Sequence, residues 1–508
     1  MRLEGKDLDL QQVWNVAMRE EKVELGDLAK EKLKESRDYI ESRLKSGEAI
    51  YGVNTGFGAF SSVRISDEEI EELQFNLIRS HCAGVGDPFT KEESRAIMLL
   101  RANALATGHS GIRLCVIEKI LEFLNNDIIP VIPQQGSVGA SGDLAPLSHL
   151  ALALIGEGEV WQDDKAVEVA DVLKDKNIEP LVLKAKEGLS LINGCQVMTA
   201  VGLLNVYKSR DLAWLVDIVG AATLESLMGS RSAFDPLIPA TRRHPGEAKT
   251  ARNLLKILGD SSEISESHRD CGRVQDAYSL RCMPAVHGAA KDAIGRTLET
   301  LEIEANSSTD NPLVFPKEGK ILSCGNFHGE PVAFALDYLC IAMAAMTSIS
   351  ECRIEKLINP AMSGLPAFLA PKGGLNSGMM IVQVAAAALV SENKILSHPA
   401  SVDSIPTSAD KEDHVSMGTI AARKLGNIVK NAQAVCAMEI LCACQALDLV
   451  KPLKPTAGVK ALYDAVREKV PFAETDRIFA KDVEVIKEMI KDGTLIKAVT
   501  SKIGELEC

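Results

Sequence analysis

Apolar residues recur at helical spacing along most of the chain. Thr90 and Glu93 match a capping box at the start of one such segment, which returns apolar residues every three or four positions. Three longer apolar segments follow. The first begins near Val332, the second runs from Met380 to Leu396, and the third covers roughly 421–449. These segments carry few charges, so other helices must cover them on more than one side. The pattern predicts a bundle of long helices.

Composition changes along the 508 residues in a way that suggests three regions. Residues 1–200 are mixed, with a short strand or turn near 49–53, and residues 201–450 hold the long helices. Residues 451–508 are charged and amphipathic, as expected of a C-terminal helical cap. We therefore expect a mainly α fold, with a long central helical bundle and a small mixed N-terminal segment carrying the active-site loops.

Residue usage supports helices and narrows the range of partners. Aromatic residues make up only 4% of the chain, which favours close-packed helices over a β-sandwich. With 70 acidic and 56 basic residues the net charge is −14, so we expect neither a nucleic-acid partner nor an anionic membrane. The apolar run at 379–390 is too short to span a bilayer. Twelve Cys without an apolar leader predict reduced thiols and a cytoplasmic protein.

Common nucleotide and zinc motifs are missing from the sequence. It contains no phosphate-binding Gly-x-x-x-x-Gly-Lys-Ser/Thr and no His-Glu-x-x-His. Two sets of side chains can be considered as metal ligands, His328 with Glu330 and His414 with Glu412 and Asp413. Because the nine histidines are scattered, we expect no metal.

The most informative stretch covers residues 136–146. Gly139 and Gly142 bracket Ala140-Ser141 and permit backbone geometry that other residues resist. Pro146 then lies where a helix can begin, and a helix N-terminus favours developing negative charge. Alone, this stretch is also compatible with an ordinary loop and helix cap.

Its surroundings resemble the aromatic amino acid ammonia-lyase family, and most closely the members that use histidine. The resemblance covers nearly the whole chain, in the order in which the family carries its motifs. The matching segments lie at 51–58, 80–84, 136–146, 191–194, 275–282, 309–312, 325–328, 376–378, 391–394 and 412–416.

The resemblance implies that Ala140-Ser141-Gly142 cyclises by itself into 4-methylidene-imidazol-5-one (MIO), with no external cofactor. The Gly142 nitrogen would attack the Ala140 carbonyl, and loss of water would turn Ser141 into a methylidene carbon. The product is an electrophile that ordinary side chains do not provide. The implied reaction converts L-histidine to trans-urocanate and ammonia, the first step of histidine degradation. Whether the substrate amine or its ring meets the electrophile stays open.

The resemblance also implies roles for individual side chains. Tyr51 corresponds to the catalytic base, although a phenol with a pKa of about 10 needs nearby positive charge or helix N-termini to act at neutral pH. Arg281 corresponds to the partner of the substrate carboxylate, for which a planar two-pronged donor is suited. Asn193 corresponds to the amide that orients the carboxylate and the MIO ring.

Four further positions carry family roles. Tyr278, a catalytic position, and Gln275, a substrate-binding position, correspond to accessory sites near the prosthetic group. Phe327 corresponds to an aromatic that lines the substrate pocket. Asp143 follows the triad and is expected to shape it.

Substrate choice rests on Ser80-His81 and Glu412, which match positions in the histidine enzymes. An imidazole offers both a donor and an acceptor, so His81 and Glu412 can bond both ring nitrogens. Such a site rejects a phenyl ring, which would leave buried polar groups unpaired. Two departures are Ala277, where many members carry Pro, and Lys411, where many histidine enzymes have Gln.

Several alternatives remain at this point. A tyrosine or phenylalanine ammonia-lyase, or an aminomutase of the same family, would carry nearly the same motifs. A helical scaffold that lost the chemistry is the alternative from another class. The resemblance further implies a homotetramer in which three chains build each active site.

Overall fold

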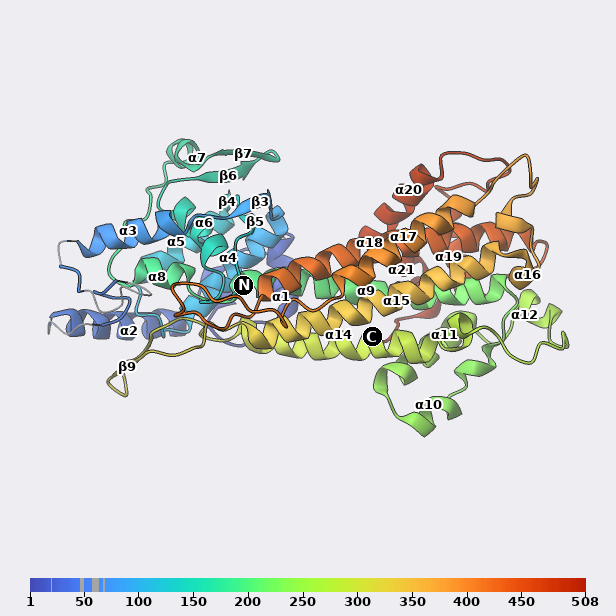
Figure 1. Cartoon of the computed structure of the whole chain (residues 1–508), viewed down its shortest axis with the longest axis horizontal. Helices are drawn as coiled ribbons and strands as arrows, with labels where there is room; N and C mark the ends of the chain where they lie inside the picture. The colour runs from blue at the N-terminus through green and yellow to red at the C-terminus, as the bar shows by residue number, and fades with distance from the viewer. Residues whose placement is uncertain (20, 46–49, 57–63, 67–68) are drawn as a thin grey trace. The chain divides into compact units, whose positions relative to one another are not determined.

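The structure is a computed structural model that describes residues 1–508 except 20, 46–49, 57–63 and 67–68 (Figure 1). The described residues are mainly α-helical with a few short strands, which confirms the predicted fold class. Position 49 of the predicted N-terminal strand or turn lies outside the described residues. So do positions 57 and 58 of the segment 51–58. Residues 51–53 form a turn.

The described residues pack into two compact units. Unit 1 comprises Met1–Leu204, Thr297–Asp337 and Pro399–Arg423, and unit 2 comprises Asn205–Arg296, Tyr338–His398 and Lys424–Cys508. This division differs from the consecutive regions 1–200, 201–450 and 451–508, which stay a prediction.

Unit 1 holds the described strands and a set of helices that lie entirely within it. The described strands form four small sheets. The first pairs β1 (Arg2–Leu3) with β2 (Glu24–Leu25), and the second pairs β3 (Val85–Pro88) with β5 (Pro133–Gln135). In the third, β6 (Glu159–Gln162) lies between β4 (Ile129–Pro130) and β7 (Lys165–Glu168), and the fourth pairs β8 (Leu313–Phe315) with β9 (Lys320–Leu322). Only the β1–β2 pair is parallel. The helices are α1 (Leu10–Ala17), α2 (Asp27–Lys45), α3 (Ile70–His81), α4 (Lys91–Ala106), α5 (Leu114–Asn125), α6 (Leu144–Leu154), α7 (Val169–Lys176) and α8 (Glu187–Ile192).

Helix α4 begins where the sequence predicts. The Thr90 hydroxyl accepts from the Glu93 amide at 3.2 Å, and the Glu93 carboxylate accepts from the Thr90 amide at 2.9 Å. The helix ends at Ala106, and Gly108 follows with φ of +84°. All residues from Ser94 to Ala106 are buried, so this helix lies in the core of unit 1.

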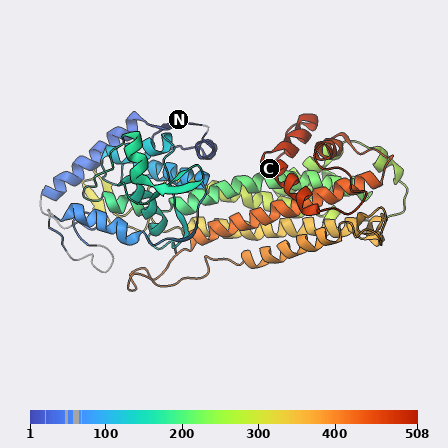
Figure 2. The same ribbon diagram turned by 90° about the horizontal axis from the view of Figure 1, so that it is seen from above.

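Four long helices contain the boundaries between the units: α9 (Gln196–Ser226), α14 (Met283–Ala305), α15 (Glu330–Ile358) and α18 (Gly418–Leu449). Their unit 2 portions lie side by side with α17 (Met380–Leu396) (Figures 1 and 2). The predicted helices at 332, 380–396 and 421–449 are thereby confirmed. The other helices of unit 2 are α10 (Leu237–Arg242), α11 (Pro245–Leu258), α12 (Glu263–Ser267), α13 (Tyr278–Arg281), α16 (Pro360–Ser363), α19 (Ala457–Arg467), α20 (Phe479–Lys491) and α21 (Thr494–Ile503).

Buried ionic groups join the long helices of unit 2. The Glu439 carboxylate on α18 accepts from the Arg353 guanidinium on α15 at 2.5 and 2.8 Å, and from the Thr223 hydroxyl on α9 at 2.7 Å. None of these groups reaches solvent, so each charge depends on its partner. Removing one partner of such a pair is strongly destabilising.

In the described part of the chain, two helices are long and apolar enough to cross a membrane by length and composition. The most apolar windows of α15 and α18 have mean hydropathies of 1.8 and 1.4. However, 56% and 72% of the residues in these windows are buried within the protein. Core helices have the same composition, so the two helices are explained by packing.

We expect Thr90→Ala to lower the free energy of unfolding by about 1 kcal/mol, because the amides of the first turn of α4 lose a capping acceptor. The shift of the urea midpoint measures this loss. Thr90→Ser keeps the acceptor and is the matched control. Equal midpoints for Thr90→Ala and the parent chain would contradict the capping role.

Candidate active site

Three helices of unit 1 bring distant segments of chain together. Helices α3, α6 and α8 pack against one another. His81 is the last residue of α3, Asn193 caps the C-terminus of α8, and Ala140–Gly142 lie just before α6. The packing of these helices therefore places the triad beside both His81 and Asn193.

Backbone geometry around the triad requires glycine. Gly139 and Gly142 have φ of +68° and +74°, a region that side chains with a Cβ disfavour. A Cβ at Gly142 would lie 2.3 Å from the carbonyl oxygen of Gly194, and one at Gly139 would lie 2.2 Å from the Ser416 hydroxyl. Neither position can accept another residue without movement of its surroundings.

The Asp143 carboxylate anchors the loop that carries the triad. One oxygen accepts from the backbone amides of Val197 and Met198, both at 2.9 Å, at the N-terminus of α9. The other accepts from the hydroxyls of Ser137, at 3.0 Å, and Thr419. Burial raises the pKa of Asp143, and these hydrogen bonds oppose that rise.

A cavity of about 1230 Å³ opens beside the triad. Seven of the side chains predicted for the site line it: Tyr51, His81, Ala140, Ser141, Asn193, Phe327 and Glu412. Gly142 is not part of the lining, although it belongs to the same loop. One cavity thus gathers predicted residues from six separate segments of the chain.

The His81 imidazole is half-buried at the edge of this cavity. Its Nδ1 lies 2.8 Å from the Leu77 carbonyl oxygen and 3.1 Å from the Ser80 hydroxyl. Because a carbonyl oxygen only accepts, Nδ1 carries the proton and Nε2 is the acceptor in the neutral ring. Burial lowers the pKa of His81, and the Leu77 hydrogen bond and the Glu412 charge oppose this only in part. The structure therefore favours a neutral imidazole.

Glu412 points at the triad from the loop before α18. Its Oε1 accepts from the Ser141 hydroxyl at 2.8 Å. Its Oε2 accepts from the hydroxyls of Thr407 and Ser408 at 2.7 and 2.8 Å. Hydroxyl donors thus hold both oxygens of the carboxylate in place.

Asn193 presents an acceptor to the cavity. Its side-chain amide donates to Asp310 at 3.3 Å and to the Asn311 carbonyl at 3.1 Å, and its backbone carbonyl accepts from Arg101 at 2.8 Å. Its Oδ1 is buried and has no hydrogen-bond partner among the described residues. An unpaired buried acceptor is costly, so this oxygen is suited to an N–H or O–H donor of a ligand.

A buried ion pair behind Asn193 was missed by sequence reasoning. The Lys186 ammonium lies 2.7 Å from the Asp310 carboxylate, and both side chains are inaccessible to solvent. Burial alone would raise the pKa of Asp310, but the charges of Lys186 and Arg101 outweigh it and hold the pKa below its ordinary value. The motif 309–312 was recognised, but nothing in its spacing pairs it with Lys186.

Three predicted residues do not line this cavity and belong to unit 2. Gln275 and Arg281 line a second cavity of about 790 Å³. The Arg281 guanidinium lies over the Tyr278 ring, 4.6 Å from its centroid, and donates to the Asp276 carbonyl at 3.1 Å. The Tyr278 side chain is 72% exposed. The two sets of predicted residues are therefore each clustered, but in different units.

Comparison with known proteins agrees with this arrangement. Residues 8–468 match the family described as aromatic amino acid lyase. A histidine ammonia-lyase from Myxococcus xanthus is 49% identical over 499 residues, which cover 98% of each chain. The crystal structure of a histidine ammonia-lyase from Trypanosoma cruzi superimposes with a TM-score of 0.92 at 42% identity, covering 99% of this chain and 96% of that one. A tyrosine aminomutase from Streptomyces globisporus gives 0.95 at 38% identity, over the full length of both chains.

The family match and the relatives that cover nearly the whole chain show that the protein is an enzyme that cleaves a carbon–nitrogen bond. The chain belongs to the aromatic amino acid lyase family.

We expect the His81 imidazole to titrate below the ordinary histidine pKa of about 6.5, because burial disfavours its charged form. The ¹³Cε1 signals of labelled histidines, followed against pH, measure this midpoint. The signal that disappears in His81→Gln identifies the residue. A midpoint at or above 6.5 would contradict the prediction.

Proposed function

We propose that the protein deaminates L-histidine to trans-urocanate and ammonia, as the first step of histidine degradation in the cytoplasm. The observation that carries this proposal is the position of His81 and Glu412, two polar side chains that can hydrogen-bond an imidazole, on the cavity that Ser141 lines. The histidine ammonia-lyases that match nearly the whole chain support the same substrate.

The residues at the triad fit the prosthetic group MIO. The cyclisation needs small residues and a close approach of backbone atoms, and Gly142 lies so near Gly194 that a Cβ could not fit. Asp143, the residue after the triad, is held by four hydrogen bonds to its carboxylate. Its backbone amide also donates to the Gly194 carbonyl oxygen at 2.8 Å. When formed from Ala140-Ser141-Gly142, the group supplies an electrophile to the cavity.

Other side chains of the cavity would bind and orient the substrate. The His81 Nε2 and the Glu412 carboxylate both accept, so together they can take the two N–H groups of the substrate imidazole in its protonated form. The free Oδ1 of Asn193 can accept from the substrate ammonium group. Phe327 contributes an apolar wall. These contacts distinguish an imidazole from a phenyl ring.

Proton removal from the substrate Cβ is assigned to Tyr51, which lines the cavity on the turn at 51–53. Departure of ammonia from Cα then leaves the conjugated double bond of the product. A histidine lyase and an aminomutase share these steps, and differ in whether the ammonia is released or added back.

Residues of unit 2 indicate how the carboxylate would be bound. The partner subunit's Arg281 is suited to pair with it in a homotetramer in which three chains build each site. Gln275 and Arg281 line one cavity of unit 2 and the Arg281 guanidinium lies over the Tyr278 ring, so a neighbouring chain could supply the three residues together.

Ultraviolet absorbance tests the substrate and the prosthetic group together. We expect absorbance to rise with L-histidine and not with L-tyrosine or L-phenylalanine, because only histidine gives the conjugated imidazole acid. The intact mass should be lower than the sequence mass by two waters. Ser141→Ala should abolish activity and should not show the loss of two waters, because alanine has no side-chain oxygen to lose. Ser148→Ala, on α6, should keep both the activity and the lowered mass.

A rise with tyrosine or phenylalanine would refute histidine as the substrate. An unmodified mass of the parent chain would refute MIO formation. A β-amino acid product without ammonia release would identify an aminomutase.

Subunit mixing tests the assembly. Tyr51→Phe and Arg281→Gln chains, each inactive alone, are co-expressed with different tags and the mixed oligomers are purified. If different chains supply the two residues, about a quarter of the sites are intact and activity returns to that level. Mixed oligomers without activity would refute the sharing of sites.

A further inference from the structure

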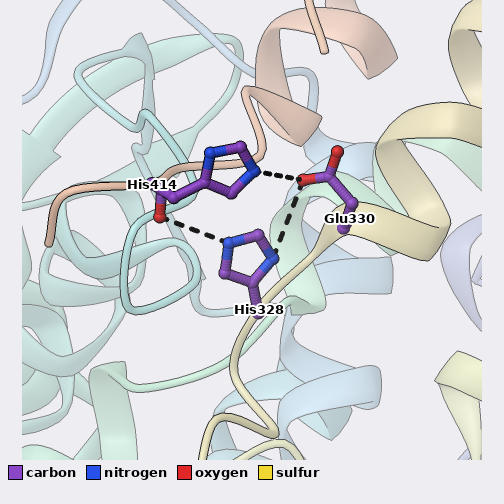
Figure 3. A group of neighbouring side chains, drawn as sticks. All are labelled: His328, Glu330 and His414. Carbon is purple, nitrogen blue, oxygen red and sulfur yellow. Dashed lines mark hydrogen bonds and ion pairs between the residues drawn. The ribbon is translucent and has the colours of Figure 1, made fainter. Parts of the chain in front are cut away.

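Two histidines and a glutamate converge at the rim of the active-site cavity. His328 and His414 line that cavity, and Glu330 is the first residue of α15. Glu330 Oε2 lies 3.8 Å from His328 Nδ1 and 3.9 Å from His414 Nε2. Figure 3 shows both rings turned toward the carboxylate. The sequence grouped His414 with its neighbours Glu412 and Asp413, but the structure joins it to Glu330 instead.

The lone pairs of this cluster face one another without a hydrogen bond between them. Distances of 3.8 and 3.9 Å are too long for one. Glu330 Oε2 is buried and has no hydrogen-bond partner among the described residues. The three ligand atoms lie within 4.8 Å of one another. A cation placed between them would satisfy all three at once.

The tautomer of His328 is the one that a metal ligand needs. Its Nε2 lies 3.3 Å from the His414 carbonyl oxygen, which only accepts, so Nε2 carries the proton. Nδ1 is then left with a lone pair directed at the side of Glu330. Metal-binding histidines characteristically donate their other N–H to a backbone carbonyl or carboxylate, which fixes the ring.

The spacing also fits a shared ion. Metal–ligand bonds of about 2.0–2.2 Å place two ligand atoms of one ion roughly 3 to 4.4 Å apart. The two rings are nearly parallel, with centroids 5.7 Å apart and planes at 4°. Because each nitrogen lone pair lies in its ring plane, the rings must turn toward each other when they share one ion.

We propose that His328, Glu330 and His414 form a binding site for a divalent transition-metal ion. Two imidazole nitrogens and one carboxylate select Zn²⁺, Co²⁺, Ni²⁺ or Mn²⁺ over Ca²⁺ and Mg²⁺, which prefer oxygen ligands. The His414 side chain is 66% exposed, so the remaining coordination positions are open to water or to a small ligand. This ion was not predicted from the sequence.

The ion would tie two segments that bear on the cavity. His328 follows Phe327 directly, and His414 lies two residues after Glu412. A bound metal therefore restrains the loop that carries Glu412 against the start of α15. It acts as a positioning element, without contact to the triad.

Cobalt titration of the chelator-treated full-length protein tests the proposal. Visible d–d absorption should saturate at one Co²⁺ per chain, and Co²⁺ should raise the thermal midpoint, because it binds only the folded state. His414→Gln and Glu330→Gln should each weaken Co²⁺ binding by about tenfold or more. His244→Gln, at an exposed histidine of unit 2, is the matched control and should bind as the parent does.

Circular dichroism establishes that each variant folds, and the exposed position of His414 makes its variant the safer of the two. Absence of a saturable band would overturn the proposal. So would equal binding by the parent and both variants, or a thiolate charge-transfer band showing that cysteines bind the ion.

Discussion

Asp143 links the chemistry of the site to the architecture of unit 1. Its carboxylate receives two backbone amides from the first turn of α9 and two hydroxyls from segments before α6 and at the start of α18. Four donors to one buried carboxylate offset part of its desolvation and leave it little freedom. Because Asp143 directly follows Gly142, this network fixes the orientation of the triad. Loss of any of these donors would disturb the triad, whose residues Ala140 and Ser141 are themselves part of the cavity wall.

A second buried charge performs a similar task for Asn193. The Lys186–Asp310 pair orients the Asn193 amide, so that its nitrogen donates to Asp310 and its oxygen is left without a hydrogen-bond partner among the described residues. A free asparagine would have no preference between its two ends. The ion pair thus determines which hydrogen-bonding group a ligand meets, although neither charge lines the cavity.

Much of this molecule follows from local sequence. The capping box at Thr90 and the bounds of α17 agree with the sequence predictions. His81, Asn193 and Glu412, to which the family resemblance assigns substrate roles, line one cavity, and those roles stay a prediction. Helical periodicity and end signals report on neighbours in the chain, which is why they succeed. Contacts between distant segments carry no such signal. Lys186 and Asp310 are 124 residues apart, and His414 meets Glu330 rather than the acidic residues beside it.

The hydrogen bond from Ser141 to Glu412 couples the proposed formation of the prosthetic group to substrate binding. As long as Ser141 keeps its hydroxyl, Oε1 of Glu412 is occupied and only weakly available to another donor. Loss of that oxygen as water during the proposed ring formation removes the donor and leaves Thr407 and Ser408 holding the other carboxylate oxygen. In a chain that has not yet formed the ring, the Ser141 hydroxyl would therefore compete with the substrate for Oε1 of Glu412. Maturation and substrate affinity would arise in a single event, so that an unfinished enzyme does not sequester the amino acid.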